Sequence, residues 1–380
     1  MTILFLFPHL IQPGGASNTL FKMARGLTER GFTVKILCAN ASEKIRIENS
    51  DLVIEELKIP NSNSMLYWIF FLFWQIKINH EIKKNTGAIL IPSVLPSNWW
   101  AWLYAITNKK VNIIWCCHEP SAFIHSSEWI NAIPNIVVRT SAKLVRPIFR
   151  ALDLYLERRS SNVFCNSEFC KTLYEKTYKR DASAVIYPFI DIKQHTPINL
   201  KKEYFFTVSR LSKFKNIDRL IIAFKDITLN HPNFKLIIAG KGEEKGNLMR
   251  LSKALNLEDK IEFTGIVDDQ TLRELYENAL STVICSEYEP FGLVPVESMM
   301  YSTPVISHNS GGPMETVLPD KTGYLYNDMP MLIKNMNSII EISKSGYQKM
   351  QLECVLQASK FDSLHSLEKL IDLIIKTSKV

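Results

Sequence analysis

The chain has 380 residues, a mass of 43.7 kDa, a net charge of +7 and 46% hydrophobic residues. This length allows two or three domains with ample cores, and the composition excludes a disordered, collagen-like or disulfide-stapled chain. The seven cysteines show no C-x-x-C pair and no metal-ligand spacing, which indicates reduced thiols of a cytoplasmic enzyme. The apolar start from Met1 to Pro8 has no basic flank, so it predicts a first strand, not a signal peptide.

Charge and tryptophan are unevenly distributed along the chain. Residues 1–190 carry a net charge of +8, whereas residues 191–380 carry a net charge of −1. All seven tryptophans lie in the first half: Trp68, Trp74, Trp99, Trp100, Trp102, Trp115 and Trp129. This asymmetry predicts two domains with different partners.

Short β-branched and aromatic runs alternate with helical stretches, a pattern typical of parallel sheets built from βαβ units. In the first half, strands are predicted over 2–7, 32–38, 53–59, 88–92, 111–116, 162–166 and 184–187. A helix over 17–30 opens after Pro13-Gly14-Gly15-Ala16 and closes at Gly31, a suitable C-cap. The first half is therefore expected to form a doubly wound α/β domain.

The second half repeats this alternation. Strands are predicted over 204–209, 234–239, 260–264, 282–286 and 304–306, with helices near 216–229, 245–256, 269–279 and 291–301. Pro188 to Pro197 has the composition of a linker. A last helix over about 362–377 lies beyond the alternating set and could pack on either domain.

The segment from Met65 to Ile76 is intensely apolar but has only 12 residues. A membrane-spanning helix needs about 20 residues, so this segment cannot cross a bilayer. Two alternatives remain open: a buried helix, or an apolar surface that dips into a membrane.

Further along, four basic residues follow a 4-3-4 spacing that would align them on one helical face: Arg139, Lys143, Arg146 and Arg150. Pro147 lies inside this run and argues against a continuous helix. A solvated face is the common explanation of such a stripe. Basic residues near an apolar patch also suit anionic lipid or a lipid diphosphate.

Two glycine turns follow predicted strands. Gly240, Gly242 and Gly246 have a G-x-G-x-x-x-G spacing, one residue longer than the dinucleotide fingerprint, and two glutamates lie where a pyrophosphate would bind. This makes an NAD site a weak interpretation and a purely geometric turn the alternative. Gly14-Gly15 opens a helix whose N–H groups could hold phosphate.

Two cations follow the first strand of the second half. Arg210 and Lys215 stand five residues apart at the carboxyl end of that strand. Ligands of open α/β sheets bind outside the carboxyl ends of the strands, and an Arg–Lys pair can grip a diphosphate. An ordinary exposed loop is the alternative on this feature alone.

The strongest motif is Glu289-Pro-Phe-Gly-Leu-Val-Pro-Val-Glu297, which follows a predicted strand and enters a helix. The strand end places Glu289 in the ligand crevice, and Gly292 lets backbone approach a ligand closely. The N–H groups of Phe291 to Val294 can donate to phosphate or sugar oxygens. Glu297 is an acceptor suited to a ribose diol.

Together these motifs resemble the retaining GT-B glycosyltransferases of glycosyltransferase family 4. The family's E-x7-E motif matches Glu289 and Glu297, and its R…K diphosphate clamp matches Arg210 and Lys215. The resemblance extends through Gly240, Gly242, Phe263-Thr-Gly265, Pro304-Val-Ile, Gly311-Gly312 with Glu315, Gly14-Gly15 and Asn166-Ser167. Ser302 and Ser209 depart from it, because the family usually has glycine at both positions.

The resemblance implies two facing Rossmann-like domains. It implies an acceptor-binding domain over 1–190, a linker over 191–200, a nucleotide-sugar-binding domain over 201–360, and a helix over 361–380 that crosses back to the first domain. Arg210 and Lys215 would hold the diphosphate, Glu297 the ribose and Glu289 a hydroxyl of the donor sugar. The other donor-binding candidates are Gly14, Gly15, Gly240, Phe291, Gly292, Leu293, and Ile266 with Val267 near the base.

His118 follows a predicted strand in Trp115-Cys-Cys-His-Glu-Pro. A lone histidine is more often structural, but the resemblance places this one beside the donor sugar, near the reacting carbon. It also implies retention by front-face attack, with His118, Glu289, Arg210 and Lys215 as the catalytic set. No D-x-D occurs in the chain, so we expect neither a metal ion nor another cofactor.

The motifs look most like those of mannosyltransferases that act on lipid-linked glycans in surface-polysaccharide biosynthesis. GDP-mannose is the expected donor, and a UDP-hexose is the alternative. A nucleotide-sugar 2-epimerase of the same fold, a silent partner subunit and an NAD oxidoreductase are weaker alternatives. We expect a peripheral protein on the cytoplasmic face of an anionic membrane, held by the N-terminal domain, with no nucleic-acid partner.

Overall fold

A computed structural model describes residues 1–12, 14–62, 64–126, 130, 136–192 and 201–379. Within it the chain divides into two compact units. The N-terminal unit comprises Met1–Phe189 and Ser363–Val380, and the C-terminal unit comprises Ile190–Asp362. Residues 193–200, most of the predicted linker, and Trp129 lie outside the described residues.

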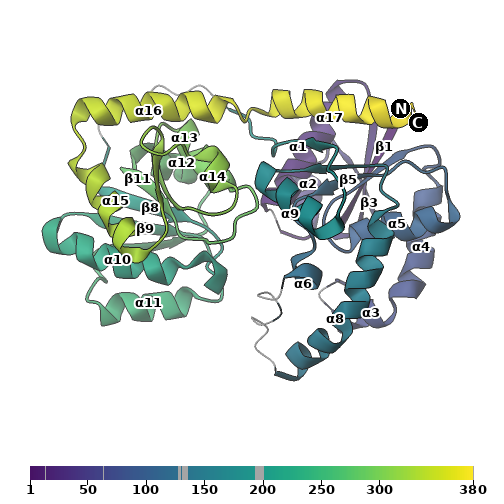
Figure 1. Cartoon of the computed structure of the whole chain (residues 1–380), viewed down its shortest axis with the longest axis horizontal. Helices are drawn as coiled ribbons and strands as arrows, with labels where there is room; N and C mark the ends of the chain where they lie inside the picture. The colour runs from purple at the N-terminus through teal and green to yellow at the C-terminus, as the bar shows by residue number, and fades with distance from the viewer. Residues whose placement is uncertain (13, 63, 127–129, 131–135, 193–200, 380) are drawn as a thin grey trace. The chain divides into compact units, whose positions relative to one another are not determined.

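The N-terminal unit is built on parallel strands in the order β3-β2-β1-β4, continued by β5-β6-β7 (Figure 1). A bridge between Leu90 and Ile113 joins the two groups of strands. The strands are β1 (Thr2–Leu10), β2 (Thr33–Ala41), β3 (Val53–Glu56), β4 (Ile89–Pro92), β5 (Ile114–Cys117), β6 (Asn162–Cys165) and β7 (Ala184–Val185). The order reverses between β1 and β4, which places ligand-binding loops at the carboxyl ends of these strands.

Helices cover this sheet. They are α1 (Gly15–Glu29), α2 (Glu43–Glu48), α3 (Met65–Ile69), α4 (Phe71–Lys83), α5 (Ser97–Thr107), α6 (Ala122–His125), α8 (Ile136–Glu157), α9 (Glu168–Tyr178) and α17 (Ser363–Ser378). The C-terminal helix α17 packs against α1 and buries four apolar side chains in the N-terminal core: Leu367, Leu370, Leu373 and Ile374. The last segment of the chain therefore completes the unit in which the chain begins.

The C-terminal unit has one parallel six-stranded sheet in the order β10-β9-β8-β11-β12-β13. Its strands are β8 (Tyr204–Val208), β9 (Lys235–Ala239), β10 (Ile261–Gly265), β11 (Ser281–Ile284), β12 (Val305–His308) and β13 (Gly323–Tyr326). Its helical elements are η1 (Lys213–Lys215), α10 (Ile217–Asn230), α11 (Lys245–Ala254), α12 (Asp269–Asn278), α13 (Leu293–Met300), α14 (Pro313–Thr316), α15 (Met329–Glu341) and α16 (Lys344–Ser359). Here the strand order reverses between β8 and β11.

Two expectations need correction. The apolar segment 65–76 is not one buried helix, because it breaks at Phe70 into α3 and α4 and exposes much of its apolar surface. Pro147 does not interrupt the basic segment, since α8 continues through it. Four of the tryptophans belong to the core of this unit, because Trp99, Trp100, Trp102 and Trp115 are fully buried.

Candidate functional site

Two loops that carry the predicted diphosphate and sugar ligands leave adjacent strands of the C-terminal unit. Arg210 and Lys215 follow β8, Glu289 follows β11, and β8 and β11 pair in parallel. Because the strand order of the sheet reverses between these two strands, both loops flank the topological switch point, where open α/β sheets bind ligands.

The loop that carries Arg210 is shaped by two glycines of the following crossover. A Cβ on Gly240 would lie 1.9 Å from the carbonyl oxygen of Ser209, and a Cβ on Gly242 would lie 2.1 Å from that of Leu211. The glycines therefore let the backbone after β9 pass directly beside the loop. The spacing of Gly240, Gly242 and Gly246 differs from the dinucleotide fingerprint. The first two glycines are instead explained by this close approach of backbone to backbone. Arg210 is exposed and forms an ion pair with Glu243 at 3.2 Å.

Lys215 ends the 3-10 turn η1, and its side chain reaches the loop after β11. Its Nζ donates to Oε2 of Glu289 at 2.5 Å, and both side chains are about three-quarters buried. The next residue, Asn216, adopts a left-handed conformation with φ 49° and donates from its amide to the carbonyl of Cys285 at 3.2 Å. The structure thus brings together two predicted site residues that lie 74 positions apart.

The loop around Glu289 rests on the glycine pair after β12. The N–H of Gly312 donates to the carbonyl of Glu289 at 2.8 Å. A Cβ on Gly311 would lie 2.4 Å from that carbonyl oxygen, and a Cβ on Gly312 would lie 2.1 Å from the carbonyl oxygen of Phe291. The Gly311-Gly312 motif is therefore required by backbone-to-backbone packing that fixes Glu289.

Gly292 starts helix α13 with φ 81°, a left-handed conformation that favours glycine. Leu293 and Val294 form the first helical turn, whose N–H groups have no acceptor within the helix. These N–H groups and the positive end of the helix dipole suit an anionic ligand. Phe291 is buried and anchors the turn beneath them.

Glu297 lies further along α13 and is held by a tyrosine that the sequence analysis did not single out. The buried Tyr276 of α12 donates from its hydroxyl to Oε2 of Glu297 at 2.9 Å. This hydrogen bond fixes the orientation of the Glu297 carboxylate, the group predicted to accept from a ribose diol. The local sequence around Tyr276 does not indicate this role, because Tyr276 and Glu297 lie 21 residues apart on two different helices.

The predicted base-contacting residues follow β10. Gly265 has φ 73°, and the next residue, Ile266, is 67% exposed, while Val267 is half-buried. The carbonyl of Gly265 accepts from the N–H of Gly240 at 2.7 Å, so the loop is tied to the turn after β9. An exposed isoleucine at a strand end is available to a flat base.

In the N-terminal unit, Gly14 caps α1 and Gly15 begins it. The N–H of Gly14 is already taken by the hydroxyl of Ser17 at 2.9 Å, so the exposed N–H groups of the first turn are those free to meet a ligand. His118 follows β5, and its Nε2 lies 3.6 Å from Sγ of Cys116. Burial lowers the pKa of His118 to about 4, which keeps its ring neutral at physiological pH.

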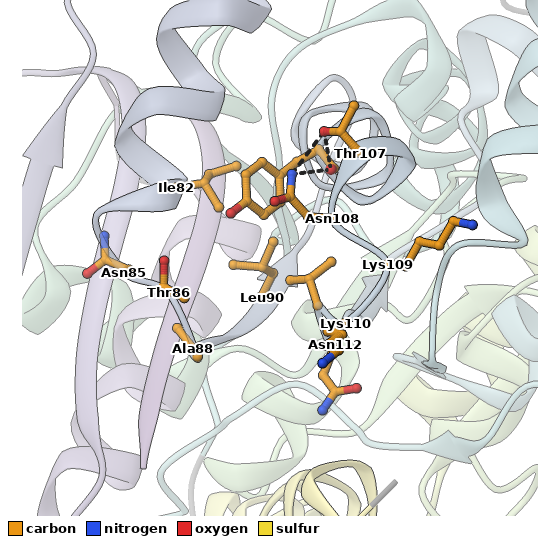
Figure 2. Close-up of a pocket in the computed structure, with 13 residues that line it drawn as sticks. Ile82, Asn85, Thr86, Ala88, Leu90, Thr107, Asn108, Lys109, Lys110 and Asn112 are labelled. Carbon is orange, nitrogen blue, oxygen red and sulfur yellow. Dashed lines mark hydrogen bonds between the residues drawn. The ribbon is translucent and has the colours of Figure 1, made fainter.

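A cavity of about 450 Å³ with a mixed polar and apolar lining lies elsewhere in this unit (Figure 2). It is lined by the turns that precede β4 and β5, including Thr86, Lys110 and Asn112. These turns lie at the amino ends of the strands. None of the predicted site residues lines the cavity, and ligands of such sheets bind at the opposite ends.

Comparisons with known proteins agree with this geometry. A family model described as "Glycosyltransferase Family 4" matches residues 13–194, and one described as "Glycosyl transferases group 1" matches residues 189–351. An uncharacterized glycosyltransferase of Methanocaldococcus jannaschii, MJ1607, is 37% identical over 67% of this chain and 67% of its own length. The chain belongs to glycosyltransferase family 4. This confirms the family that the motifs predicted.

The chain is also similar to a mannosyltransferase and to solved glycosyltransferase structures at lower identity. The alpha-1,3/1,6-mannosyltransferase ALG2 of Candida glabrata is 24% identical over 84% of this chain and 78% of its own length. Among solved structures, HepE of Anabaena in complex with UDP-glucose aligns with a TM-score of 0.79 and 21% identity, over 99% of this chain and 100% of that one. These structural neighbours confirm the GT-B class, with two Rossmann-like domains.

Proposed function

We propose that this glycosyltransferase moves a hexose, with retention of configuration and without a metal ion, from a nucleotide sugar to a lipid-linked glycan. GDP-mannose is the proposed donor, supported by the ALG2 mannosyltransferases among the relatives. A UDP-hexose is the second candidate, because structural neighbours were solved with UDP and UDP-glucose.

The observation that carries the proposal is the Lys215–Glu289 pair at the switch point of the C-terminal sheet. A cation and a carboxylate at this position can bind two parts of one nucleotide-sugar donor. Lys215 and Arg210 would bind its diphosphate, and Glu289 would bind its sugar. The exposed guanidinium of Arg210 needs only to leave Glu243 to reach a phosphate oxygen. These cations and the α13 N-terminus would neutralise charge on the departing nucleotide.

The residues then divide the work of transfer. Glu297, oriented by Tyr276, accepts hydrogen bonds from the ribose hydroxyls. Glu289 orients the sugar and stabilises positive charge that develops at its ring, and neutral His118 contacts the sugar as a hydrogen-bond partner. In front-face attack the acceptor oxygen bonds to the anomeric carbon as the bond to the phosphate breaks. The departing phosphate oxygen takes the proton of the acceptor hydroxyl.

The test of the activity uses radiolabelled GDP-mannose and UDP-glucose with purified enzyme, membrane lipid extract and EDTA. We expect label from GDP-mannose in the organic phase. Removing one preorganised donor of this kind costs about 2.7–4 kcal/mol, so Arg210→Ala and Lys215→Ala should each slow transfer on the order of 10²–10³-fold. Transfer that requires added divalent metal, or that survives in both variants, would contradict the proposal.

An apolar surface of the N-terminal unit supports contact with a membrane, where a lipid-linked acceptor resides. Among the described residues, no helix is both long and apolar enough to cross a bilayer. However, α4 exposes Leu72 and Phe73 at 75% and 61%, and α8 exposes Leu144 and Ile148 at 74% and 70%. The two surfaces adjoin, since the rings of Trp68 and Phe149 meet edge to face at 6.2 Å.

The charge of this surface suits anionic lipid. Lys143 and Arg150 are exposed on α8 between its apolar side chains. Each lysine or arginine near an anionic surface contributes about 1 kcal/mol, and burying one large apolar side chain contributes about 1.5–3 kcal/mol. The surface formed by α3, α4 and α8 can therefore hold the protein on a membrane without a spanning helix.

Flotation with vesicles of phosphatidylcholine and phosphatidylglycerol tests this contact. The double variant Leu72→Ser with Phe73→Ser should leave the vesicle fraction while its melting temperature stays near that of the wild type, because both side chains are exposed. Leu352→Ser with Leu356→Ser is the matched control, since these residues of α16 are exposed at 58% and 62%. Equal release of both double variants, or of neither, would contradict the assignment.

A further inference from the structure

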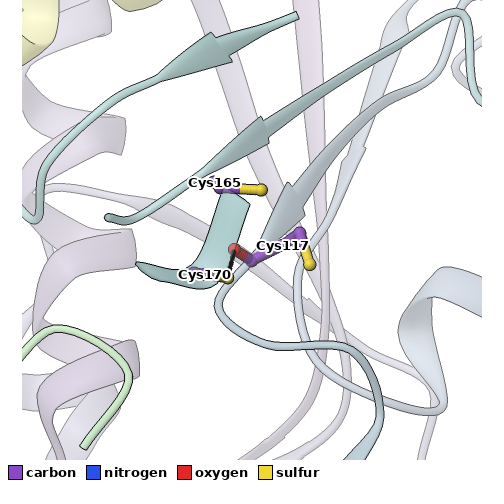
Figure 3. A group of neighbouring side chains, drawn as sticks. All are labelled: Cys117, Cys165 and Cys170. Carbon is purple, nitrogen blue, oxygen red and sulfur yellow. Dashed lines mark hydrogen bonds between the residues drawn. The ribbon is translucent and has the colours of Figure 1, made fainter. Parts of the chain in front are cut away.

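Three cysteines that are far apart in sequence meet in the N-terminal unit. Cys117 ends β5, Cys165 ends β6 and Cys170 lies in the first turn of α9, and all three are fully buried. Their Sγ atoms lie within 4.8 Å of one another (Figure 3). Among the described residues, they form the one group of at least three histidine, cysteine or acidic side chains that is spaced to share a cation.

The spacing is close to that of a metal–thiolate site. With a metal–sulfur bond of about 2.3 Å, the sulfurs of a tetrahedral or trigonal site lie roughly 3.8–4.0 Å apart. Changes of side-chain torsion can supply the remaining contraction, because each thiol comes from a separate element. The ligand set is three soft sulfurs, which favours Cu(I) and Zn²⁺ over Mg²⁺ or Ca²⁺.

The hydrogen bonds of the cluster are weak ones made by a thiol. The Sγ of Cys170 donates to the backbone carbonyls of Cys117 at 3.3 Å and of His118 at 3.1 Å. The thiolate is the form of cysteine that binds metals, so a bound cation would replace this thiol proton.

We propose that Cys117, Cys165 and Cys170 bind one thiolate-preferring cation, Cu(I) or Zn²⁺, as a structural site. Binding forms metal–sulfur bonds and releases the thiol protons to solvent. No electron transfer is involved. The sequence analysis found no metal spacing because the ligands are 48 and 5 residues apart and converge only when β5 and β6 pair.

Such a site would tie together the loops that carry predicted function in this unit. Cys117 directly precedes His118, and Cys165 directly precedes Asn166-Ser167. Ser167 caps α9 by accepting from the N–H of Cys170 at 2.8 Å. A bound cation would hold the backbone of His118 to the start of α9. The role is structural and stands independently of the proposed metal-free transfer.

Metal stoichiometry provides the test. Reduced, metal-free full-length protein is titrated with Cu(I) against bicinchoninate and, separately, with Zn²⁺ against a chromogenic chelator. We expect one equivalent of at least one cation to bind and to raise the melting temperature. Cys165→Ala and Cys170→Ala should weaken that binding at least 100-fold. Cys38→Ala, which removes another buried thiol of the same unit, should retain it.

The cysteine variants could lose metal binding simply because they unfold. X-ray absorption at the edge of the bound metal identifies the ligand atoms directly in the wild-type protein. The spectrum should show three sulfur neighbours. Failure of both cations to bind the wild type, binding unchanged in Cys165→Ala, or a shell of nitrogen and oxygen would each overturn the proposal. None of these results would bear on transfer from a nucleotide sugar in EDTA.

Discussion

The ion pair between Lys215 and Glu289 makes an unusual prediction for Glu289→Gln. Glu289 forms an ion pair with Lys215, the cation that would bind the diphosphate. The glutamine keeps the shape of the side chain but releases Lys215 from its charged partner. We therefore expect Glu289→Gln to bind a nucleoside diphosphate more tightly than the wild type while it transfers sugar far more slowly.

The magnitude follows from the burial of the pair. Charges about 4 Å apart attract by about 4 kcal/mol at an effective dielectric constant of about 20, whereas exposed pairs are worth about 0.2–1 kcal/mol. The side chains of Lys215 and Glu289 are 26% and 24% exposed, so solvent screening leaves about 1 kcal/mol. That corresponds to roughly fivefold tighter binding. Loss of the carboxylate charge beside the sugar should slow turnover about 10²-fold or more.

Calorimetric titration with GDP and with UDP measures the affinity, and transfer of radiolabelled sugar measures the turnover. Glu287→Gln is the matched control, because Glu287 lies two residues away and pairs with Arg219 instead. We expect the control to leave both quantities unchanged. Unchanged or weaker binding of both nucleotides by Glu289→Gln would refute the idea that Glu289 competes with the diphosphate for Lys215.

Three further predictions concern single residues. Ser302→Gly should raise the free energy of unfolding by about 0.5–1 kcal/mol, since relief of a left-handed φ of 57° outweighs the entropy that glycine adds to the unfolded chain; Ser302→Ala should give no such gain in thermal melts. Tyr276→Phe should raise the KM for the nucleotide sugar several-fold with little change in kcat, and an unchanged KM would show that Tyr276 does not position Glu297. Because burial lowers the pKa of His118 to about 4 from 6.5, the native state binds fewer protons than the unfolded state between these values. Stability should therefore fall as the pH drops from 6.5 to 4, by up to about 1.4 kcal/mol per pH unit for this group, and urea unfolding of His118→Gln should show a shallower dependence.

Local sequence predicted the elements of this protein well where periodicity and strand-end motifs determine them. The strands other than β13 and the motif around Glu289 belong to this class. Strand β13 and several helices were not predicted, among them α5, α9, α15 and α16. Helix α5 is buried on most of its surface, including Trp99, Trp100 and Trp102, so its sequence shows little of the alternation between apolar and polar residues that marks an amphipathic helix.

Features that depend on long-range contacts could not be predicted from the sequence alone. The support of the Arg210 loop by Gly240 and Gly242 is a backbone contact across two crossovers. The bond between Tyr276 and Glu297 and the meeting of three cysteines likewise arise from tertiary structure. The left-handed backbone of Ser302, with φ 57°, was likewise not predicted, although the family usually has glycine at this position.

The return of α17 to the N-terminal unit has a consequence for biosynthesis. Gly26 of α1 leaves room for Leu367, which would lie 3.0 Å from an added Cβ, so the groove that receives α17 is specific for that helix. The ribosome must translate α17 before this groove can be filled. The N-terminal unit, although made first, therefore matures last, and a nascent or truncated chain that ends before Ser363 presents an open apolar groove to chaperones.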